Sequence, residues 1–253
     1  MYYWLHNNAK QIEKLSSGST FSEASTSLMK SLKITIPKID EQKQIANVLS
    51  SFDKKIELLK EQNQTLETMA QTIFKESIQN KADLIEVSLG EIVNIKYGKD
   101  HKHLKDGDYP LYGSGGIMRH VEKPLYQKES ILIPRKGTLG NLFFIQEPFW
   151  SVDTIFYTEI DDTKVFPIYL YYQLKRFNLA NLNVGSAVPS LTTKVLNAIK
   201  LEIPIIEKQK KTVDSLIVLN KKVLNNLSQI ETLSNTRDLL LPKLIDGSIR
   251  VNI

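Results

Sequence analysis

The chain has 253 residues, of which 42% are hydrophobic and 24% charged, enough for one large folded domain or two modest ones. Its net charge of +5 and isoelectric point near 9.1 fit nucleic-acid binding without being specific for it. The absence of cysteine excludes disulfides and Cys-ligated metals, and no apolar run is long enough to span a bilayer, so we expect a cytoplasmic protein.

The first 37 residues end in a predicted β-strand. Leu32-Lys-Ile-Thr-Ile-Pro37 alternates apolar and polar residues as a half-buried strand does, and its proline ends the strand. The opening residues, Met1-Tyr-Tyr-Trp-Leu-His6, lack the basic-then-apolar pattern of a signal peptide.

A long helix is predicted after this strand. The stretch contains neither glycine nor proline, and forty residues of helix would measure about 60 Å. Its apolar residues recur at heptad spacing, at Ile45, Phe52, Leu59, Leu66 and Ile73, with Val48 and Met69 at intermediate positions. Such heptads predict a seam against a second helix, with two ordinary core helices as the alternative.

The central part of the chain has a different pattern. Short apolar segments alternate there with turn signals such as Gly113-Ser-Gly-Gly116 and Lys136-Gly137, and residues 166–177 have helical character. The apolar segments are Ile92–Ile95, Ile131–Ile133, Leu142–Ile145 and Thr154–Thr158. We expect an α+β globular domain inserted between two long helices.

The C-terminal part repeats the N-terminal part at an offset of 167 residues. Gly18-Ser19 aligns with Gly185-Ser186, Ile36-Pro37 with Ile203-Pro204, and Gln42-Lys43 with Gln209-Lys210. A second strand is therefore predicted over Ile199–Pro204, followed by a second long helix. The apolar residues of this helix keep a three–four rhythm, at Val213, Leu216, Val223, Leu227, Ile230, Leu241 and Leu244.

Motifs for catalysis are missing from the sequence. There is no Gly-x-x-x-x-Gly-Lys-Ser/Thr phosphate loop, no Asn-Pro-Pro-aromatic motif of adenine methyltransferases and no Pro-Asp-led nuclease signature. His101 and His103 have no third metal ligand at a suitable spacing. We therefore expect no catalytic residue, no metal and no cofactor.

Five local motifs make the chain resemble the specificity (S) subunit of type I restriction–modification systems. Asn183–Lys194 resembles the end of a target-recognition domain, Ile203–Lys210 the junction into a conserved-region helix, and Arg237–Arg250 the C-terminus of the family. Leu111–Ile117 and Ile133–Gly140 resemble internal motifs of the recognition domain. The resemblance covers the entire chain.

The resemblance implies four parts. Residues 1–37 would be the C-terminal remnant of a first target-recognition domain, 38–82 a long conserved-region helix and 83–204 a complete target-recognition domain. Residues 205–253 would be the second conserved-region helix with a C-terminal tail. The implied fold is α+β, with a globular domain flanked by two long helices that form an antiparallel coiled coil. Full family members have two recognition domains, so we expect a truncated gene, a recombination cassette or a half-subunit that dimerises.

The implied function is sequence-specific binding of double-stranded DNA. Such a subunit is not itself an enzyme: it reads one half of a bipartite target and docks the modification (adenine methyltransferase) subunits, while the restriction (translocase/nuclease) subunit joins through the complex. A second copy of the chain or a complementary fragment stays open as a partner, and no membrane is expected. The alternative is an inactive or regulatory remnant that acts as a coiled-coil scaffold for the methylase without reading DNA.

Charge within the central domain points to a DNA-binding half. Residues 94–140 carry nine Lys/Arg against five Asp/Glu, whereas residues 141–163 carry five acids and no Lys or Arg. Arg135 follows an apolar strand and precedes a glycine turn, so it is the first candidate for base readout, with a β-turn arginine as the alternative. The other expected DNA contacts are Lys136, Lys96, Lys99, Lys102, His103, Arg119, Tyr112, Ser186 and Lys194. Alternatively, Ser190 or Thr192 simply caps a helix that begins before Val195.

Overall fold

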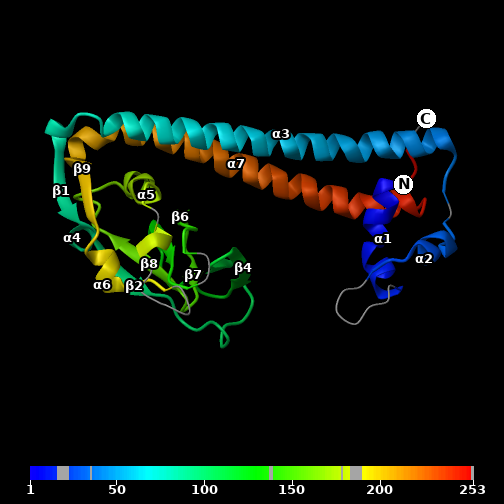
Figure 1. Cartoon of the computed structure of the whole chain (residues 1–253), viewed down its shortest axis with the longest axis horizontal. Helices are drawn as coiled ribbons and strands as arrows, with labels where there is room; N and C mark the ends of the chain where they lie inside the picture. Colours follow the sequence, from blue (N-terminus) through cyan, green and yellow to red (C-terminus); the bar gives the residue numbers. More distant parts are fainter. Residues whose placement is uncertain (16–22, 35, 137–138, 178, 183–189, 252–253) are drawn as a thin grey trace. The chain divides into compact units, whose positions relative to one another are not determined.

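The computed structural model describes residues 1–15, 23–34, 36–136, 139–177, 179–182 and 190–251 (Figure 1). The chain divides into two compact units. Unit 1 combines residues 1–66 with residues 221–253, and unit 2 comprises residues 67–220. The two longest helices, α3 (Ile39–Ser77) and α7 (Ile206–Ile245), contribute to both units.

Helices α3 and α7 run antiparallel, as the family resemblance implies. In unit 1, Asp53 contacts Arg237 and Asn63 contacts Asn226, so position rises along one helix as it falls along the other. Acidic residues occupy the first turn of each helix and a lysine the last turn, which favours both helices through their dipoles. The predicted antiparallel helix pair is confirmed.

The buried stripe on each helix departs from the predicted heptads at two positions. Met69 is 48% exposed and its neighbour Ala70 is buried, while Leu227 is 50% exposed and Asn226 is fully buried. Ile56 and Ala70 are both buried and lie two heptads apart, so Met69 falls just outside the buried face. Met69, predicted at an intermediate position of the first helix, and Leu227, predicted in the apolar rhythm of the second, were each wrong by one residue.

Unit 1 contains two further helices, α1 (Tyr2–Leu15) and α2 (Thr26–Ser31), the second capped by the Ser25 hydroxyl. Its core joins the start of α3 to the end of α7 through Ile45, Leu49, Leu241 and Leu244. The strand predicted over residues 32–37 is wrong for the described residues 32–34 and 36–37, which have no strand assignment. Alternation of side chains is not sufficient for a strand, which also needs a partner for its backbone.

The described residues of unit 2 form nine strands in three sheets. The four-stranded sheet has the order β2 (Val93–Tyr97), β8 (Ile155–Ile160), β5 (Ser130–Pro134) and β6 (Phe143–Ile145). The three-stranded sheet has the order β4 (Gly116–Val121), β3 (Tyr109–Gly113) and β7 (Trp150–Ser151). The third sheet pairs β1 (Leu84–Ser88) with β9 (Lys200–Pro204), which is the second predicted strand.

The helices of unit 2 build one core with the four-stranded sheet. The shorter helical elements of this unit are α4 (Leu89–Ile92), α5 (Pro167–Lys175), α6 (Thr193–Asn197) and the 3₁₀ turns Lys81–Asp83 and Leu179–Leu182. Phe74 of α3 packs on Tyr169 of α5 with ring centres 4.8 Å apart. A second core lies around β3, β7 and the other face of β5. The α+β prediction is confirmed.

The Gln-Lys element of the repeat has a structural explanation. The Gln209 side-chain amide donates to the carbonyl of Pro204 at 2.8 Å, and Gln42 donates to the carbonyl of Pro37 at 2.9 Å. Each glutamine therefore ties the first turn of a long helix to the proline that precedes it. The same hydrogen bond forms in both units, which explains why the Pro and Gln positions are repeated in the sequence.

Candidate nucleic-acid interface

Strands β2 and β5 end at the same edge of the four-stranded sheet. Both are antiparallel to β8, and Tyr97 and Ile133 are both in register with Phe156 of that strand. The chain leaving each strand therefore emerges on the same side. Tyr97 is the last residue of β2, and Arg135 directly follows β5. The strand pairing therefore brings them together although they are distant in sequence.

Arg135 is held at this edge by backbone and side-chain contacts. Its amide donates to the Thr154 carbonyl at 2.9 Å, and its carbonyl accepts from the Leu191 amide at 3.0 Å. Its guanidinium carbon lies 5.2 Å from the centre of the Tyr97 ring, within the range of a cation–π contact. Tyr97 is 50% exposed and packs edge-on against buried Phe156. The pair forms a semi-rigid aromatic and cationic platform facing solvent.

A loop, residues 98–108, follows Tyr97 and carries three lysines and three aspartates. Gly98 allows the chain to turn closely over β7, because a Cβ there would lie 2.1 Å from the Val152 carbonyl oxygen. The Lys99 amide donates to the Ser151 carbonyl, and the Lys99 carbonyl accepts from the Trp150 indole at 3.1 Å. Within the described part of the chain, neither Lys99 nor Lys102 forms an ion pair, so both ammonium groups are available for a phosphate.

Arg119 holds this loop in place. Its guanidinium forms an ion pair with Asp106 at 2.8 Å and donates to the carbonyls of His101 and Leu104 at 2.9 and 3.0 Å. The side chain is only 31% exposed. With its donors used in this way, Arg119 is better suited to shaping the loop than to contacting a ligand.

Two other predicted contacts are partly neutralised. Lys96 lies 3.7 Å from Glu159, and His103 lies 4.0 Å from Asp100 while its ring packs edge-on against Trp150. Both side chains remain accessible, but each already has an acidic neighbour. Their electrostatic attraction for a phosphate is therefore weaker than that of Lys99 or Lys102.

Tyr112 is a core residue, and its expected surface role was wrong. Its side chain is 8% exposed and packs between the rings of Phe143 and Phe149. Burial raises its pKa to about 12. Four of the five residues of β3 are buried and Tyr109 is half-buried, so alternation along this strand does not mark an exposed face.

The segment that begins at residue 190 lies beside the residues that follow β5. Lys136 and Ser190 form an isolated antiparallel bridge, and both Lys136 and Lys194 are exposed. Thr192 caps α6 by accepting from the Val195 amide, so the capping interpretation of this motif is confirmed. Ser186, another predicted contact, lies outside the described residues.

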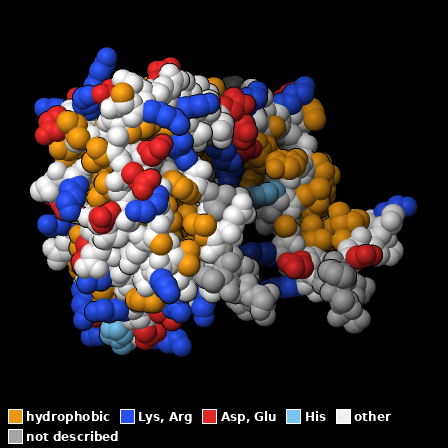
Figure 2. Space-filling model, turned by 60° about the vertical axis from the view of Figure 1, so that its left-hand side comes forward, with side chains coloured by type: hydrophobic (Ala, Val, Ile, Leu, Met, Phe, Trp, Pro, Cys, Tyr) orange, Lys and Arg blue, Asp and Glu red, His pale blue; other side chains and the backbone are white. Residues whose placement is uncertain are grey.

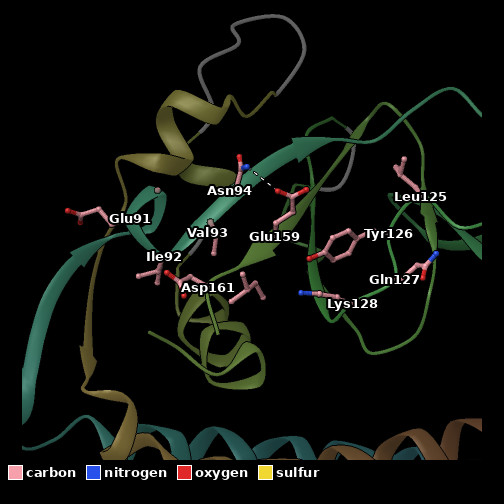
Figure 3. Close-up of a pocket in the computed structure, with 12 residues that line it drawn as sticks. Glu91, Ile92, Val93, Asn94, Leu125, Tyr126, Gln127, Lys128, Glu159 and Asp161 are labelled. Carbon is pink, nitrogen blue, oxygen red and sulfur yellow. Dashed lines mark hydrogen bonds between the residues drawn. The ribbon is translucent and has the colours of Figure 1, made fainter. Parts of the chain in front are cut away.

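The opposite end of the β2–β8 ladder is acidic. A depression of about 770 Å³ is lined by Glu91, Glu159 and Asp161, and Asn94 donates to Glu159 there at 3.0 Å. Figure 3 shows these side chains. The Ser88 hydroxyl and amide hold the pKa of Glu91 below its usual value, and Thr163 and Lys164 lower that of Asp161. Sequence reasoning missed this site because its residues come from three separate segments.

Charge on the surface is mixed rather than uniformly basic. Figure 2 shows Lys and Arg side chains over much of one face, with Asp and Glu side chains among them. Net charge alone therefore does not locate a DNA surface. The charges do differ along the β2–β8 ladder: unpaired lysines and Arg135 lie at one end, and the three carboxylates lie at the other.

Comparison with known proteins gives consistent matches over nearly the whole chain. The family model "Type I restriction modification DNA specificity domain" matches residues 1–68 and 82–233. A Mycoplasma genitalium protein named as a type I specificity subunit is 27% identical over 96% of this chain and 69% of its own length. A Methanocaldococcus jannaschii type I restriction enzyme specificity subunit is 28% identical over 96% of this chain and 66% of its own length.

A solved structure shares the fold. The crystal structure of a type I restriction–modification S subunit from M. genitalium superposes with a TM-score of 0.71 at 25% identity, covering 96% of this chain and 71% of that one. The chain thus spans about two thirds of the length of the relatives that it matches. Within the described residues, no helix is long and apolar enough to cross a membrane.

Proposed function

The chain belongs to the type I restriction–modification DNA specificity family, and we propose that its unit 2 reads one half of a bipartite DNA target. Members of this family are the DNA-recognition subunits of their complexes and do not catalyse the reaction themselves. The observation that supports half-site reading is the Arg135–Tyr97 platform beside unpaired lysines.

Arg135 is the proposed base reader. A guanidinium presents a planar fork of donors that matches the two acceptors of guanine in the major groove. Stacking on Tyr97 limits the rotamers of this long side chain, and its backbone is fixed by Thr154 and Leu191. The arrangement therefore reduces the entropy that would be lost when arginine engages a base edge.

The surrounding lysines are proposed as phosphate contacts. Lys99 and Lys102 come from the loop after β2, Lys136 from the exit of β5, and Lys194 from α6. Lys96 and His103 are proposed as weaker contacts because of their acidic neighbours, and Ser186 remains a proposed contact. Arg119 is assigned the indirect role of ordering the loop.

The two long helices are proposed to dock the modification subunits. Helical residues of unit 1 leave large apolar side chains exposed at Leu58, Leu224 and Leu239, the last two 46% and 66% accessible. Such residues on an otherwise polar helix surface suit a protein partner. The restriction subunit would join through that complex, and a second copy or complementary fragment would supply another half-site.

A scaffold that binds the methylase without reading DNA is the alternative, and one experiment separates the two. Purified chain is titrated onto fluorescent duplexes with and without the modification subunit, at several salt concentrations. Half-site reading predicts tighter binding to a subset of sequences, and the chain alone should show no methylation. Binding to the modification subunit together with equal affinity for all duplexes would support the scaffold instead.

Methylation provides an independent readout of docking. With the modification subunit and S-adenosylmethionine present, transfer to adenine should appear in duplexes that carry the target. The Leu58→Glu and Leu239→Glu variants should reduce this transfer while leaving DNA binding by the chain alone unchanged. Unchanged transfer in both variants would place the docking surface elsewhere.

A further inference from the structure

The seam between α3 and α7 contains a polar layer. Asn226 is fully buried, and its side-chain amide donates to the side-chain oxygens of Gln62 and Asn63, each at 2.8 Å. Within the described residues, the Asn226 Oδ1 is also buried and has no hydrogen-bond partner. Burying polar atoms in a helix seam lowers stability, so a seam that keeps them is specified for something other than maximal stability.

The sequence repeat shows that this layer breaks the symmetry between the two helices. At the offset of 167, Asn226 corresponds to Leu59, and Asn63 corresponds to Ile230. Leu59 is 3% exposed and Ile230 is half-buried. Because α3 and α7 run antiparallel with Asn63 opposite Asn226, the layer one turn away places Leu59 opposite Ile230. An apolar layer and a polar layer are therefore neighbours.

If either helix paired with a second copy of itself, the polar residues of one copy would lie opposite apolar residues of the other. Since α3 and α7 are repeats, two α3 helices could pair in the same antiparallel geometry, which would place Leu59 of each opposite Asn63 of the other. Two α7 helices would likewise place Asn226 opposite Ile230. Each asparagine would then be buried against an aliphatic side chain, without a hydrogen-bond partner.

A second pair has the same asymmetry. Arg237 and Asp53 form an ion pair at 2.7 Å, and the Asp53 carboxylate also accepts from the Tyr3 hydroxyl. The repeat equivalents of Asp53 and Arg237 are Asn220 and Ala70, which carry no charge. A helix paired with its own copy would therefore leave both charged groups opposite residues that cannot form an ion pair with them.

We propose that the Asn63–Asn226 layer, with Gln62, restricts the seam to pairing of α3 with α7 and disfavours α3–α3 and α7–α7 pairing. An assembly of two chains must then either keep each helix pair intact or exchange whole helices so that α3 still meets α7. The layer thus selects which helix is the partner, and the ion pair of Asp53 with Arg237 reinforces the choice.

Three sequence backgrounds, which differ only in the helix seam, test whether the polar layer selects the partner helix. The first is the natural seam. In the apolar seam, Asn63→Ile and Asn226→Leu make both layers hydrophobic in every pairing. In the transposed seam, Leu59→Asn, Asn63→Ile, Asn226→Leu and Ile230→Asn exchange the two layers, which preserves composition and the preference for α3 with α7.

Single cysteines report the pairing, because the chain has none of its own. In antiparallel α3–α3 pairing, position 60 of one chain lies beside position 60 of the other, so Lys60→Cys is the reporter for α3. Leu227→Cys, its repeat equivalent, is the reporter for α7. Each reporter is placed in the full-length chain in all three backgrounds, and disulfide-linked dimers are measured after mild oxidation, with circular dichroism melts as the check on folding.

The expected result is a severalfold higher yield of linked dimers in the apolar seam than in the natural or transposed seam, together with a higher melting temperature. Asn226→Leu alone should raise linkage only at the α7 reporter, which keeps the test decisive if the double variant does not fold. Equal linkage in the natural and apolar seams, or no linkage at the α7 reporter in Asn226→Leu, would overturn the proposal.

Discussion

Arg135 and Tyr97 meet at one edge of the four-stranded sheet, with the guanidinium carbon 5.2 Å from the ring centre. The contact exists because β2 and β5 both pair antiparallel with β8 and so end at the same edge. Neither residue needs to move to form it. A cation fixed on an aromatic surface beside flexible lysines separates two tasks, base readout and phosphate attraction, and these tasks have different experimental signatures.

Arg119→Ala should reduce both stability and DNA binding. The change removes the ion pair with Asp106 and leaves the carbonyls of His101 and Leu104 without these donors, at a cost of about 1–2 kcal/mol in the free energy of unfolding. Urea unfolding measures the cost. Arg119→Lys should not restore it, since one ammonium cannot reproduce the three contacts. Normal stability with lost DNA binding would instead make Arg119 a direct contact.

Leu59→Glu should strongly destabilise the chain, whereas Leu58→Glu should be nearly neutral. Leu59 is 3% exposed in the helix seam and its neighbour Leu58 is 56% exposed, so the two variants add the same charge one residue apart. Truncating a buried leucine costs about 2–5 kcal/mol, and a buried carboxylate should cost at least as much. Thermal unfolding compares them, and similar melting temperatures would mean that the seam is misassigned. Ile230→Glu should have a smaller effect in the same direction.

Asp53 should make stability depend on pH in acid. Although burial opposes it, hydrogen bonds from Tyr3 and Arg237 lower the pKa of Asp53 from its ordinary 3.8. A carboxylate with a lowered folded-state pKa adds stability that is complete above the unfolded value and is lost as pH falls through the folded value. The difference in unfolding free energy between the natural chain and Asp53→Asn should therefore be constant above pH ~5 and shrink below pH ~4. A difference that stays constant down to pH ~2.5 would contradict this assignment.

Lys102→Ala should weaken binding to all duplexes equally. Each phosphate contact releases condensed counterions, so its loss should lower the slope of log affinity against log salt by about one unit. Lys99→Ala should behave in the same way, and Lys55→Ala, an exposed lysine of α3, is the control with no expected change. Binding isotherms at several salt concentrations measure the slope. A loss confined to particular sequences would make Lys102 a base contact.

The features predictable from the sequence are those set by local patterns. Heptads and a 167-residue repeat predict two long helices that share an apolar seam, because periodicity determines which face of a helix is apolar. The same reasoning failed where a distant partner decides the outcome. Residues 32–37 alternate like Ile199–Pro204, but only the second segment meets a strand, β1. Tyr112 was predicted to lie at the surface, but it packs against Phe143 and Phe149, which come from later segments of the chain.

The site residues also divide into those predicted by a local pattern and those that depend on distant parts of the chain. Arg135 was predicted from a local signal, an arginine between an apolar strand and a glycine turn, and it stays a proposed base contact. Other features depend on strand order, which the spacing of residues in the sequence does not determine. Strand order places Tyr97 against Arg135 and Arg119 against its loop. It also forms the acidic depression at Glu91, Glu159 and Asp161. Charge counts predicted a basic half of the domain but could not distinguish free cations from paired ones.

The most direct test of DNA reading by unit 2 is selection of duplexes from a randomised pool by the natural chain, Arg135→Ala and Lys102→Ala. We predict that the natural chain enriches one motif and that Lys102→Ala enriches the same motif with lower affinity. Arg135→Ala should lose preference at one base pair, at a cost of about 1–3 kcal/mol on the selected half-site. Failure of the natural chain to enrich any motif, or an unchanged motif with Arg135→Ala, would contradict the assignment of base readout to this edge of the sheet.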